Sequence, residues 1–227
     1  MQAIFETVFD SVYLLGVIIL GIIMLSKSKR RPFVKLYGIM AIILGVGDAF
    51  HLVPRMYGLI FDVMDDIPQY LGFGKLVTSI TMTVFYVMLF HVWILRYKKM
   101  GVWLWRLVIY ILAAARIVLC LMPQNDWFSA TPPLIWGIFR NIPFAFIGII
   151  MIYLFFTQSR WNRDGHFKNM WLYIMLSFLF YIPVVLFAGT YPIVGMLMLP
   201  KTVMYFLIVL LGFGEIDSTR SRNGILA

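Results

Sequence analysis

The chain has 227 residues, of which 62% are hydrophobic and only 13% are charged, and its formal net charge is +9. Average soluble domains contain about 45–50% apolar and about 25% charged residues, so this composition excludes a water-soluble globular fold as well as a disordered or coiled-coil chain. The single cysteine, Cys120, excludes an internal disulfide and any zinc site built from cysteines.

Seven apolar segments follow one another along the chain, and each is long enough to cross a bilayer, which takes about 20 mostly apolar residues in a helix. They are residues 8–25, 34–54, 72–94, 104–122, 134–156, 169–188 and 193–213. Strands are not expected at these lengths, because a lone strand leaves its backbone groups unpaired in lipid. We therefore predict an all-α integral membrane protein in which residues 1–227 form a single seven-transmembrane-helix bundle.

The first segment is predicted to be a retained helix and not a cleaved signal peptide. A signal peptide carries its positive charges before the apolar core. Here the residues before the apolar core include Glu6 and Asp10, and the basic cluster at 27–31 follows it. This pattern places the N-terminus outside.

The charges of the connecting loops predict the orientation of the whole bundle. Fourteen of the 19 basic residues fall in the loops 26–35, 96–106 and 157–168 and in the tail after residue 214. The opposite loops carry four acidic residues, Asp62, Asp65, Asp66 and Asp126. Because loops rich in Lys and Arg stay on the cytoplasmic side, we predict an outside N-terminus and a cytoplasmic C-terminus, in the plasma membrane.

Five basic residues remain, and all of them map to the outer half of the predicted bundle. They are Arg55, Lys75, Arg116, Arg140 and Lys201. A charged side chain at mid-bilayer costs at least about 2.5–3.5 kcal/mol on insertion scales, so these residues are expected to face the bundle interior. Since they outnumber the carboxylates there, we predict an outward-facing basic pocket for an anion.

The second segment supplies the carboxylate and imidazole closest to that pocket. Asp48, His51 and Arg55 are spaced so that they share one face of a helix. Asp48 and His51 are therefore the candidate acid/base residues. The alternative reading is structural, with Asp48 paired to Arg116 or Arg140 to hold helices together.

Hydroxyl and amide groups complete the predicted pocket. The expected ligand-binding residues are Arg55, Lys75, Thr78, Arg116, Arg140, Asn141, Lys201 and Tyr205. The expected partners are the lipid bilayer and an anionic or amphipathic small molecule or lipid, because guanidinium groups suit phosphate and carboxylate. No nucleic-acid partner and no cofactor are expected. The sequence leaves open whether the protein forms a homo-oligomer.

No metal site is expected either. The three histidines, His51, His91 and His166, fall at different depths of the bundle and cannot converge on one ion.

Three functions follow from this pattern. The first is a small transporter or receptor-like protein that binds its ligand in the basic pocket. The second is an intramembrane enzyme that acts on a lipid headgroup, with Asp48 and His51 as acid and base and the cations stabilising negative charge. The third is an accessory structural membrane subunit whose charges are internal ion pairs.

Overall fold

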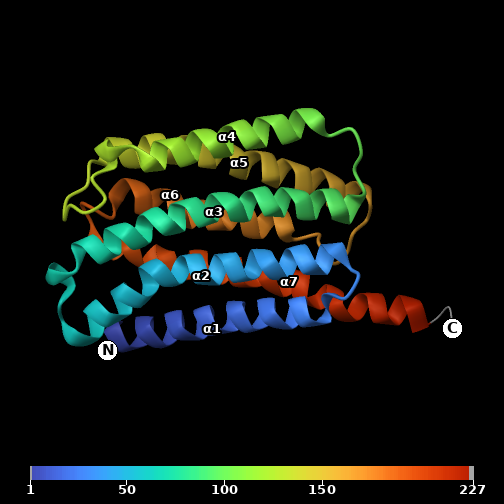
Figure 1. The fold of residues 1–227 in the computed structure, drawn as a ribbon, viewed down its shortest axis with the longest axis horizontal. Helices are drawn as coiled ribbons and strands as arrows, with labels where there is room; N and C mark the ends of the chain where they lie inside the picture. Colours follow the sequence, from blue (N-terminus) through green and yellow to red (C-terminus); the bar gives the residue numbers. More distant parts are fainter. Residues whose placement is uncertain (1, 225–227) are drawn as a thin grey trace.

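The computed structural model describes residues 2–224, and it describes the backbone alone for Gln2, Asp65, Pro192 and residues 217–224. Within this range the chain is all-helical, and seven helices are long and apolar enough to cross a membrane (Figure 1). These are α1 (Gln2–Ser28), α2 (Pro32–Phe61), α3 (Pro68–Tyr97), α4 (Trp103–Leu121), α5 (Leu134–Trp161), α6 (Met170–Phe187) and α7 (Met198–Gly224). Short 3-10 turns at Met64–Asp66, Pro123–Asn125 and Pro192–Leu197 lie in three of the connections. Four charges counted in the loops and the tail, those of Asp65, Asp217, Arg220 and Arg222, lie outside the described side chains.

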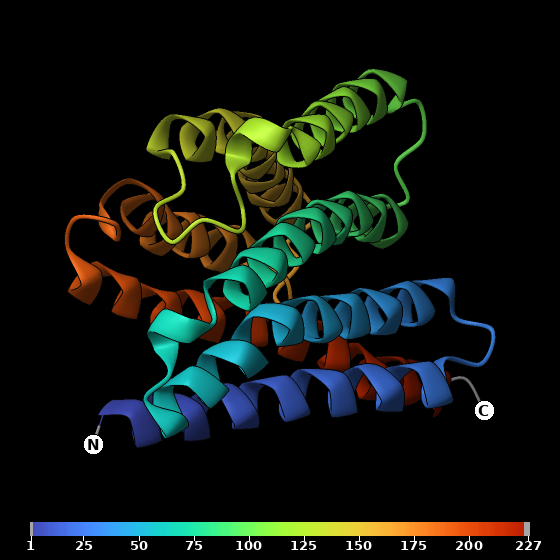
Figure 2. The ribbon, with the colours of Figure 1, turned by 60° about the vertical axis from the view of Figure 1, so that its left-hand side comes forward.

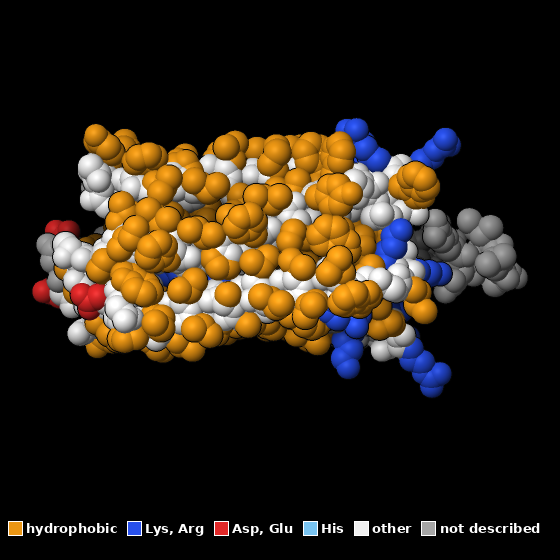
Figure 3. Space-filling view, turned by 90° about the horizontal axis from the view of Figure 1, so that it is seen from above, with side chains coloured by type: hydrophobic (Ala, Val, Ile, Leu, Met, Phe, Trp, Pro, Cys, Tyr) orange, Lys and Arg blue, Asp and Glu red, His pale blue; other side chains and the backbone are white. Residues whose placement is uncertain are grey.

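Consecutive helices run up and down and pack on one another, and α7 returns to pack against both α1 and α2 (Figures 1 and 2). The odd number of crossings places the two termini at opposite ends of the bundle. Acidic side chains gather at the end that holds the N-terminus, and basic side chains surround the other end (Figure 3). We call these the acidic end and the basic end. The band between them is covered by hydrophobic side chains, as expected for a surface in contact with lipid.

Helix α2 is longer than predicted, because it continues through Pro54 to Phe61. Proline has no N–H, so the carbonyl of Phe50, four residues earlier, loses its helical partner. Gly74 of α3 packs directly on that carbonyl, where a Cβ would overlap it. Helix α3 therefore covers the Phe50 carbonyl that lost its helical partner. A proline inside a membrane helix is tolerated where a neighbouring helix packs against the freed backbone group.

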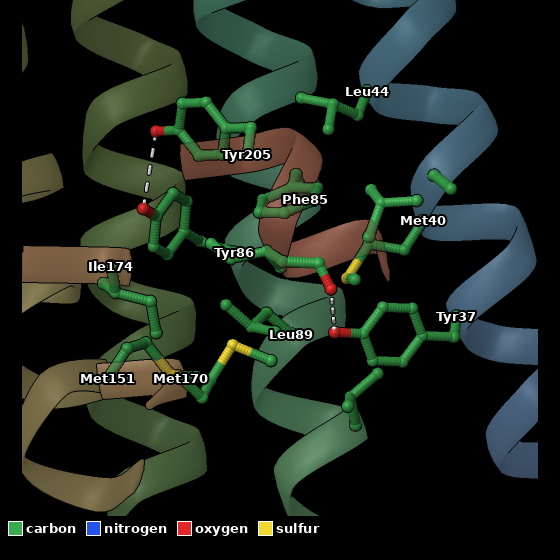
Figure 4. Close-up of a cluster of buried hydrophobic side chains, with 14 of the residues drawn as sticks. Tyr37, Met40, Leu44, Phe85, Tyr86, Leu89, Met151, Met170, Ile174 and Tyr205 are labelled. Carbon is green, nitrogen blue, oxygen red and sulfur yellow. Dashed lines mark hydrogen bonds between the residues drawn. The ribbon is translucent and has the colours of Figure 1, made fainter. Parts of the chain in front are cut away.

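Helix α3 lies at the centre of the bundle. In its most apolar stretch 44% of the residues are buried, whereas only 22% are buried in the corresponding stretches of α4 and α6. Its fully buried Phe85 and Tyr86 pack edge-on against each other, and Phe85 packs against Tyr205 of α7 (Figure 4). The Tyr86 and Tyr205 hydroxyls lie 3.4 Å apart, so these two rings hold α3 and α7 together inside the apolar core.

A charged network closes the basic end. The Arg96 guanidinium donates to both carboxylate oxygens of Asp164, at 2.8 and 2.9 Å, and its third nitrogen lies 2.7 Å from Glu215. It also lies 4.5 Å from the centroid of the Phe167 ring. Burial alone would raise the pKa of Asp164, but hydrogen bonds from Arg96 and from the Phe167 N–H, with the Arg96 charge, hold that pKa below its ordinary value of 3.8. One arginine thus ties α3 to the α5–α6 connection and to α7.

Candidate functional site

Arg55 pairs with a carboxylate of the first helix, and it is not among the residues that line the cavity described below. Its guanidinium lies 2.8 Å from Glu6, which is only 3% exposed. Glu6 precedes the predicted apolar segment 8–25, and so it is not expected inside the membrane region. Helix α1 begins at Gln2, which brings Glu6 alongside α2.

Asp48 is bound by a tyrosine and not by an arginine. The Tyr13 hydroxyl of α1 donates to its carboxylate at 2.7 Å. Among the described side chains it forms no ion pair with Arg116 or Arg140, the two partners considered for it. His51, one turn further along α2, has a buried Nδ1 without a hydrogen-bond partner in the described part of the chain. The two candidate acid/base residues are therefore on one helix face without a hydrogen bond between them.

Arg116 and Lys201 are buried cations that lie over aromatic rings. Arg116 of α4 is 1% exposed, and its guanidinium carbon lies 3.3 Å from the centroid of the Phe144 ring of α5. Lys201 of α7 is 7% exposed, and its ammonium lies 4.7 Å from the centroid of the Tyr181 ring of α6. Such cation–π contacts stabilise a desolvated cation by about 2 kcal/mol or more. Neither cation has a carboxylate within 4.0 Å among the described side chains.

These two cations are close enough to interact electrostatically with each other. Asp48 is the described carboxylate that acts on Lys201, at a distance beyond direct ion pairing. Nε and Nη1 of Arg116 have no hydrogen-bond partner in the described part of the chain. The interior therefore holds an excess of positive charge near the ends of α4 and α7.

The remaining two predicted cations, Lys75 and Arg140, meet at a cavity of about 380 Å³ at the acidic end. The cavity lies between the start of α3 and the connection from α4 to α5. Its lining residues are Met64, Pro68, Leu71, Gly72, Lys75, Trp127, Ser129, Ala130, Pro132 and Arg140. Neither Lys75 nor Arg140 has an ion-pair partner among the described carboxylates.

Arg140 is held in place by the turn that ends α4. Its Nη1 donates to the Asn125 side-chain oxygen at 2.8 Å, and its guanidinium lies 4.2 Å from the centroid of the Trp127 ring. Asn125 is itself fixed, because its amide donates to the carbonyls of Leu119 and Met122 at the end of α4. Trp127 is fixed in the same way by its indole N–H, which donates to the Cys120 carbonyl in the last turn of α4 at 2.8 Å. The arginine head is thus oriented by two residues that the helix end itself anchors.

The three other predicted ligand-binding residues have partners inside the protein. Thr78 donates to the Gly47 carbonyl of α2 at 3.0 Å. The Asn141 amide donates to the Gly137 carbonyl, and its oxygen accepts a hydrogen bond from Tyr181 at 2.9 Å. Tyr205 lies in the aromatic core described above. Of the eight predicted ligand-binding residues, only Lys75 and Arg140 line the cavity in the described part of the chain.

Several residues of this site carry no clear signal in the sequence. In the sequence Trp127 looks like an ordinary membrane-interface anchor, and Asn125 and Ser129 look like ordinary loop residues. Their position after α4 gives one usable signal, since an asparagine in a turn commonly hydrogen-bonds nearby backbone groups through its side chain. Tyr13 and Glu6 were missed because a single sequence does not show which helices pack together, and it is the packing of α1 on α2 that brings these residues to Asp48 and Arg55.

Comparisons of the chain with models of protein families, with curated proteins and with solved structures each gave no match. The function is therefore argued from the geometry of the site.

Proposed function

We propose that this multi-pass membrane protein binds a small anion at the cavity of the acidic end, as a transporter or receptor-like protein. The observation that carries the proposal is that Lys75 and Arg140 line one cavity without a described carboxylate to neutralise them. Its volume of about 380 Å³ lies within the range of about 300–1,000 Å³ that ligand pockets occupy. A carboxylate, phosphate or sulfate group matches both cations.

The two cations have different tasks in this proposal. The one hydrogen bond of Arg140 to a described residue uses Nη1, so its other N–H groups are available for a planar, two-point contact with the anion. Lys75 adds a point charge from α3, and Ser129 adds a hydroxyl. Trp127 forms an apolar wall beside them. The site therefore suits an organic anion with a small apolar part better than a bare ion.

We also propose that the acidic end faces outward and that the protein resides in the plasma membrane. The support is the concentration of Lys and Arg at the opposite end (Figure 3), since such loops stay cytoplasmic. Cysteine labelling in whole cells tests both points. In a Cys120→Ser background, a cysteine at Asp126 should react with a membrane-impermeant maleimide, whereas a cysteine at Lys98 should not. The reverse result overturns the orientation.

The enzyme alternative has no specific observation in its favour. Asp48 accepts a hydrogen bond from Tyr13, and no hydrogen bond joins it to His51 among the described side chains. The alternative of a structural subunit accounts for Arg55, because the ion pair of Arg55 with Glu6 joins α1 to α2. It does not account for Lys75 and Arg140, which line the cavity without an ion pair to a described carboxylate.

A binding experiment tests the proposed site. Purified protein in neutral detergent is titrated with phosphate, sulfate, acetate and succinate as sodium salts, and thermal unfolding is followed, because a bound anion stabilises the folded state. At least one anion should raise the unfolding temperature at constant ionic strength. Lys75→Met and Arg140→Met should abolish the increase, and Arg140→Lys should reduce it, because a lysine cannot make the two-point contact. Lys98→Met, which removes an exposed cation outside the cavity, is the matched control.

Two results would overturn the proposal. One is the absence of a shift with every anion of the panel. The other is a shift that persists unchanged in both methionine variants. Uptake of the bound anion into proteoliposomes then separates a transporter from a receptor-like protein.

A further inference from the structure

A second hollow lies on the lipid-facing side of the bundle, in a groove between α5 and α6. Its volume is about 190 Å³, and it is lined by Ile138, Asn141, Ile142, Phe144, Ala145, Phe178, Tyr181, Ile182, Val185 and Leu186. Ile142 and Ile182 on its walls are 46% and 47% exposed, so the groove opens toward the hydrocarbon of the bilayer. It is separate from the cavity of Lys75 and Arg140, with which it shares no lining residue.

The two buried cations lie directly behind this groove. Phe144 lines the groove and carries the Arg116 guanidinium over its ring, at 3.3 Å from the centroid. Tyr181 lines the same groove and carries the Lys201 ammonium at 4.7 Å. The two rings contact each other edge-on, with centroids 6.1 Å apart. A pair of aromatic rings therefore separates an apolar groove from two cations.

The charge behind the rings is not balanced within the described part of the chain. Arg116 is 1% exposed, and two of its nitrogens have no hydrogen-bond partner there. Lys201 has no ion pair, and the described carboxylate that acts on it, Asp48, is already bound by Tyr13. An unpaired cation inside a membrane protein is costly and marks a functional site by default.

We propose that the α5–α6 groove binds a single-chain anionic amphiphile from the bilayer, with its chain in the groove and its head at Arg116 and Lys201. An apolar groove beside buried cations is complementary to a molecule with one hydrocarbon chain and one negative head. The head reaches the cations when the Phe144 and Tyr181 side chains rotate apart. The Tyr181 hydroxyl, which donates to Asn141 in this structure, is then free to donate to the head.

The inference goes beyond the proposed function, because it concerns a different ligand class and a different set of lining residues. The proposed ligand carries an anionic head group, which two kinds of molecule can supply. One is the carboxylate of a fatty acid, and the other is the phosphate of a lysophospholipid. Oleate and lysophosphatidate represent these sources. Methyl oleate and lysophosphatidylcholine have the same chains without a net negative charge, and they are the matched controls.

Photo-cross-linking locates the ligand. The purified protein in phosphatidylcholine nanodiscs is illuminated with an oleate analogue that carries a diazirine in its chain, and the adducts are mapped by mass spectrometry. Adducts should concentrate on α5 and α6 around the groove. Unlabelled oleate or lysophosphatidate should compete, and methyl oleate and lysophosphatidylcholine should not.

Two sets of variants test the two halves of the site. Ala145→Phe fills the groove and should abolish labelling, whereas Ile149→Phe, at a 60% exposed position one turn along α5, should leave it unchanged. Arg116→Met and Lys201→Met should each weaken oleate binding about tenfold or more, as expected from the loss of one charge-assisted hydrogen bond. If Arg116→Met does not fold, Lys201→Met and Ala145→Phe still decide the question.

Adducts spread evenly over all lipid-facing helices would overturn the inference, as would equal competition by methyl oleate. Labelling that is unchanged in Ala145→Phe would do the same. Anion binding at Lys75 and Arg140 should be unaffected by Ala145→Phe, so failure here is distinguishable from failure of the proposed function.

Discussion

Gly72 should be one of the least replaceable residues at the acidic end. It lies in the second turn of α3, it is buried, and a Cβ at this position would overlap the carbonyl group of Trp127. The obstacle is backbone and not a flexible side chain, so it cannot rotate away. The Trp127 side chain is also held by a hydrogen bond to the Cys120 carbonyl and lies against Arg140.

The expected cost of Gly72→Ala follows from two opposing effects. Overpacking a well-packed site costs about 1–3 kcal/mol, and occasionally more. Replacing glycine by alanine inside a helix returns about 1 kcal/mol. The net destabilisation should therefore reach about 2 kcal/mol, which lowers the unfolding temperature of a chain of this length by about 4–8 °C.

Gly137→Ala is the matched control, because Gly137 is also a buried glycine near the same end, in α5. Its nearest neighbour outside the helix backbone is Nη2 of Arg140, at 3.7 Å from the added Cβ, which is ordinary van der Waals contact. This substitution should keep the helix-propensity gain and raise the unfolding temperature by a few degrees. Both variants are measured by thermal unfolding in the same detergent. If Gly72→Ala lowers the unfolding temperature no more than Gly137→Ala does, the inferred contact between α3 and the α4–α5 connection is refuted.

Three further predictions concern stability. Arg96→Met should lower the unfolding temperature more than Lys98→Met, because it removes the cation that donates two hydrogen bonds to Asp164 and forms an ion pair with Glu215, at a cost of about 1–3 kcal/mol after allowance for partial exposure. The pKa of Asp164 is lower in the folded protein than its ordinary value of 3.8. The stabilisation from this carboxylate should therefore be fully present above pH 3.8 and be lost as the pH falls through the folded pKa. The gap in unfolding temperature between wild type and Asp164→Asn should therefore narrow only below pH 3.8, and narrowing already at neutral pH would contradict the pairing. Tyr13→Phe should cost about 1–3 kcal/mol in unfolding free energy, because it removes the hydrogen-bond donor of Asp48, and an unchanged value would argue against that bond.

The sequence predicted some parts of the candidate site and missed others for a common reason. Lys75 and Arg140 could be recognised as unusual because any cation inside an apolar segment is costly, wherever its neighbours lie. The pairing of Arg55 could not be recognised, because it depends on Glu6 of another helix. The rings under Arg116 and Lys201 were equally invisible, since the chain contains 20 Phe and 12 Tyr residues and no pattern selects Phe144 or Tyr181.

The sequence by itself determined the seven membrane-crossing helices and the segregation of basic and acidic loops to the two ends. Both properties are local, because insertion into lipid depends on the hydropathy of about 20 consecutive residues and loop charge is counted loop by loop. Only the tertiary structure decided which buried charges pair, which lie over rings and which line a cavity. Those outcomes depend on how each helix is rotated and which helices touch, and in a bilayer these are set by side-chain packing between segments far apart in the chain.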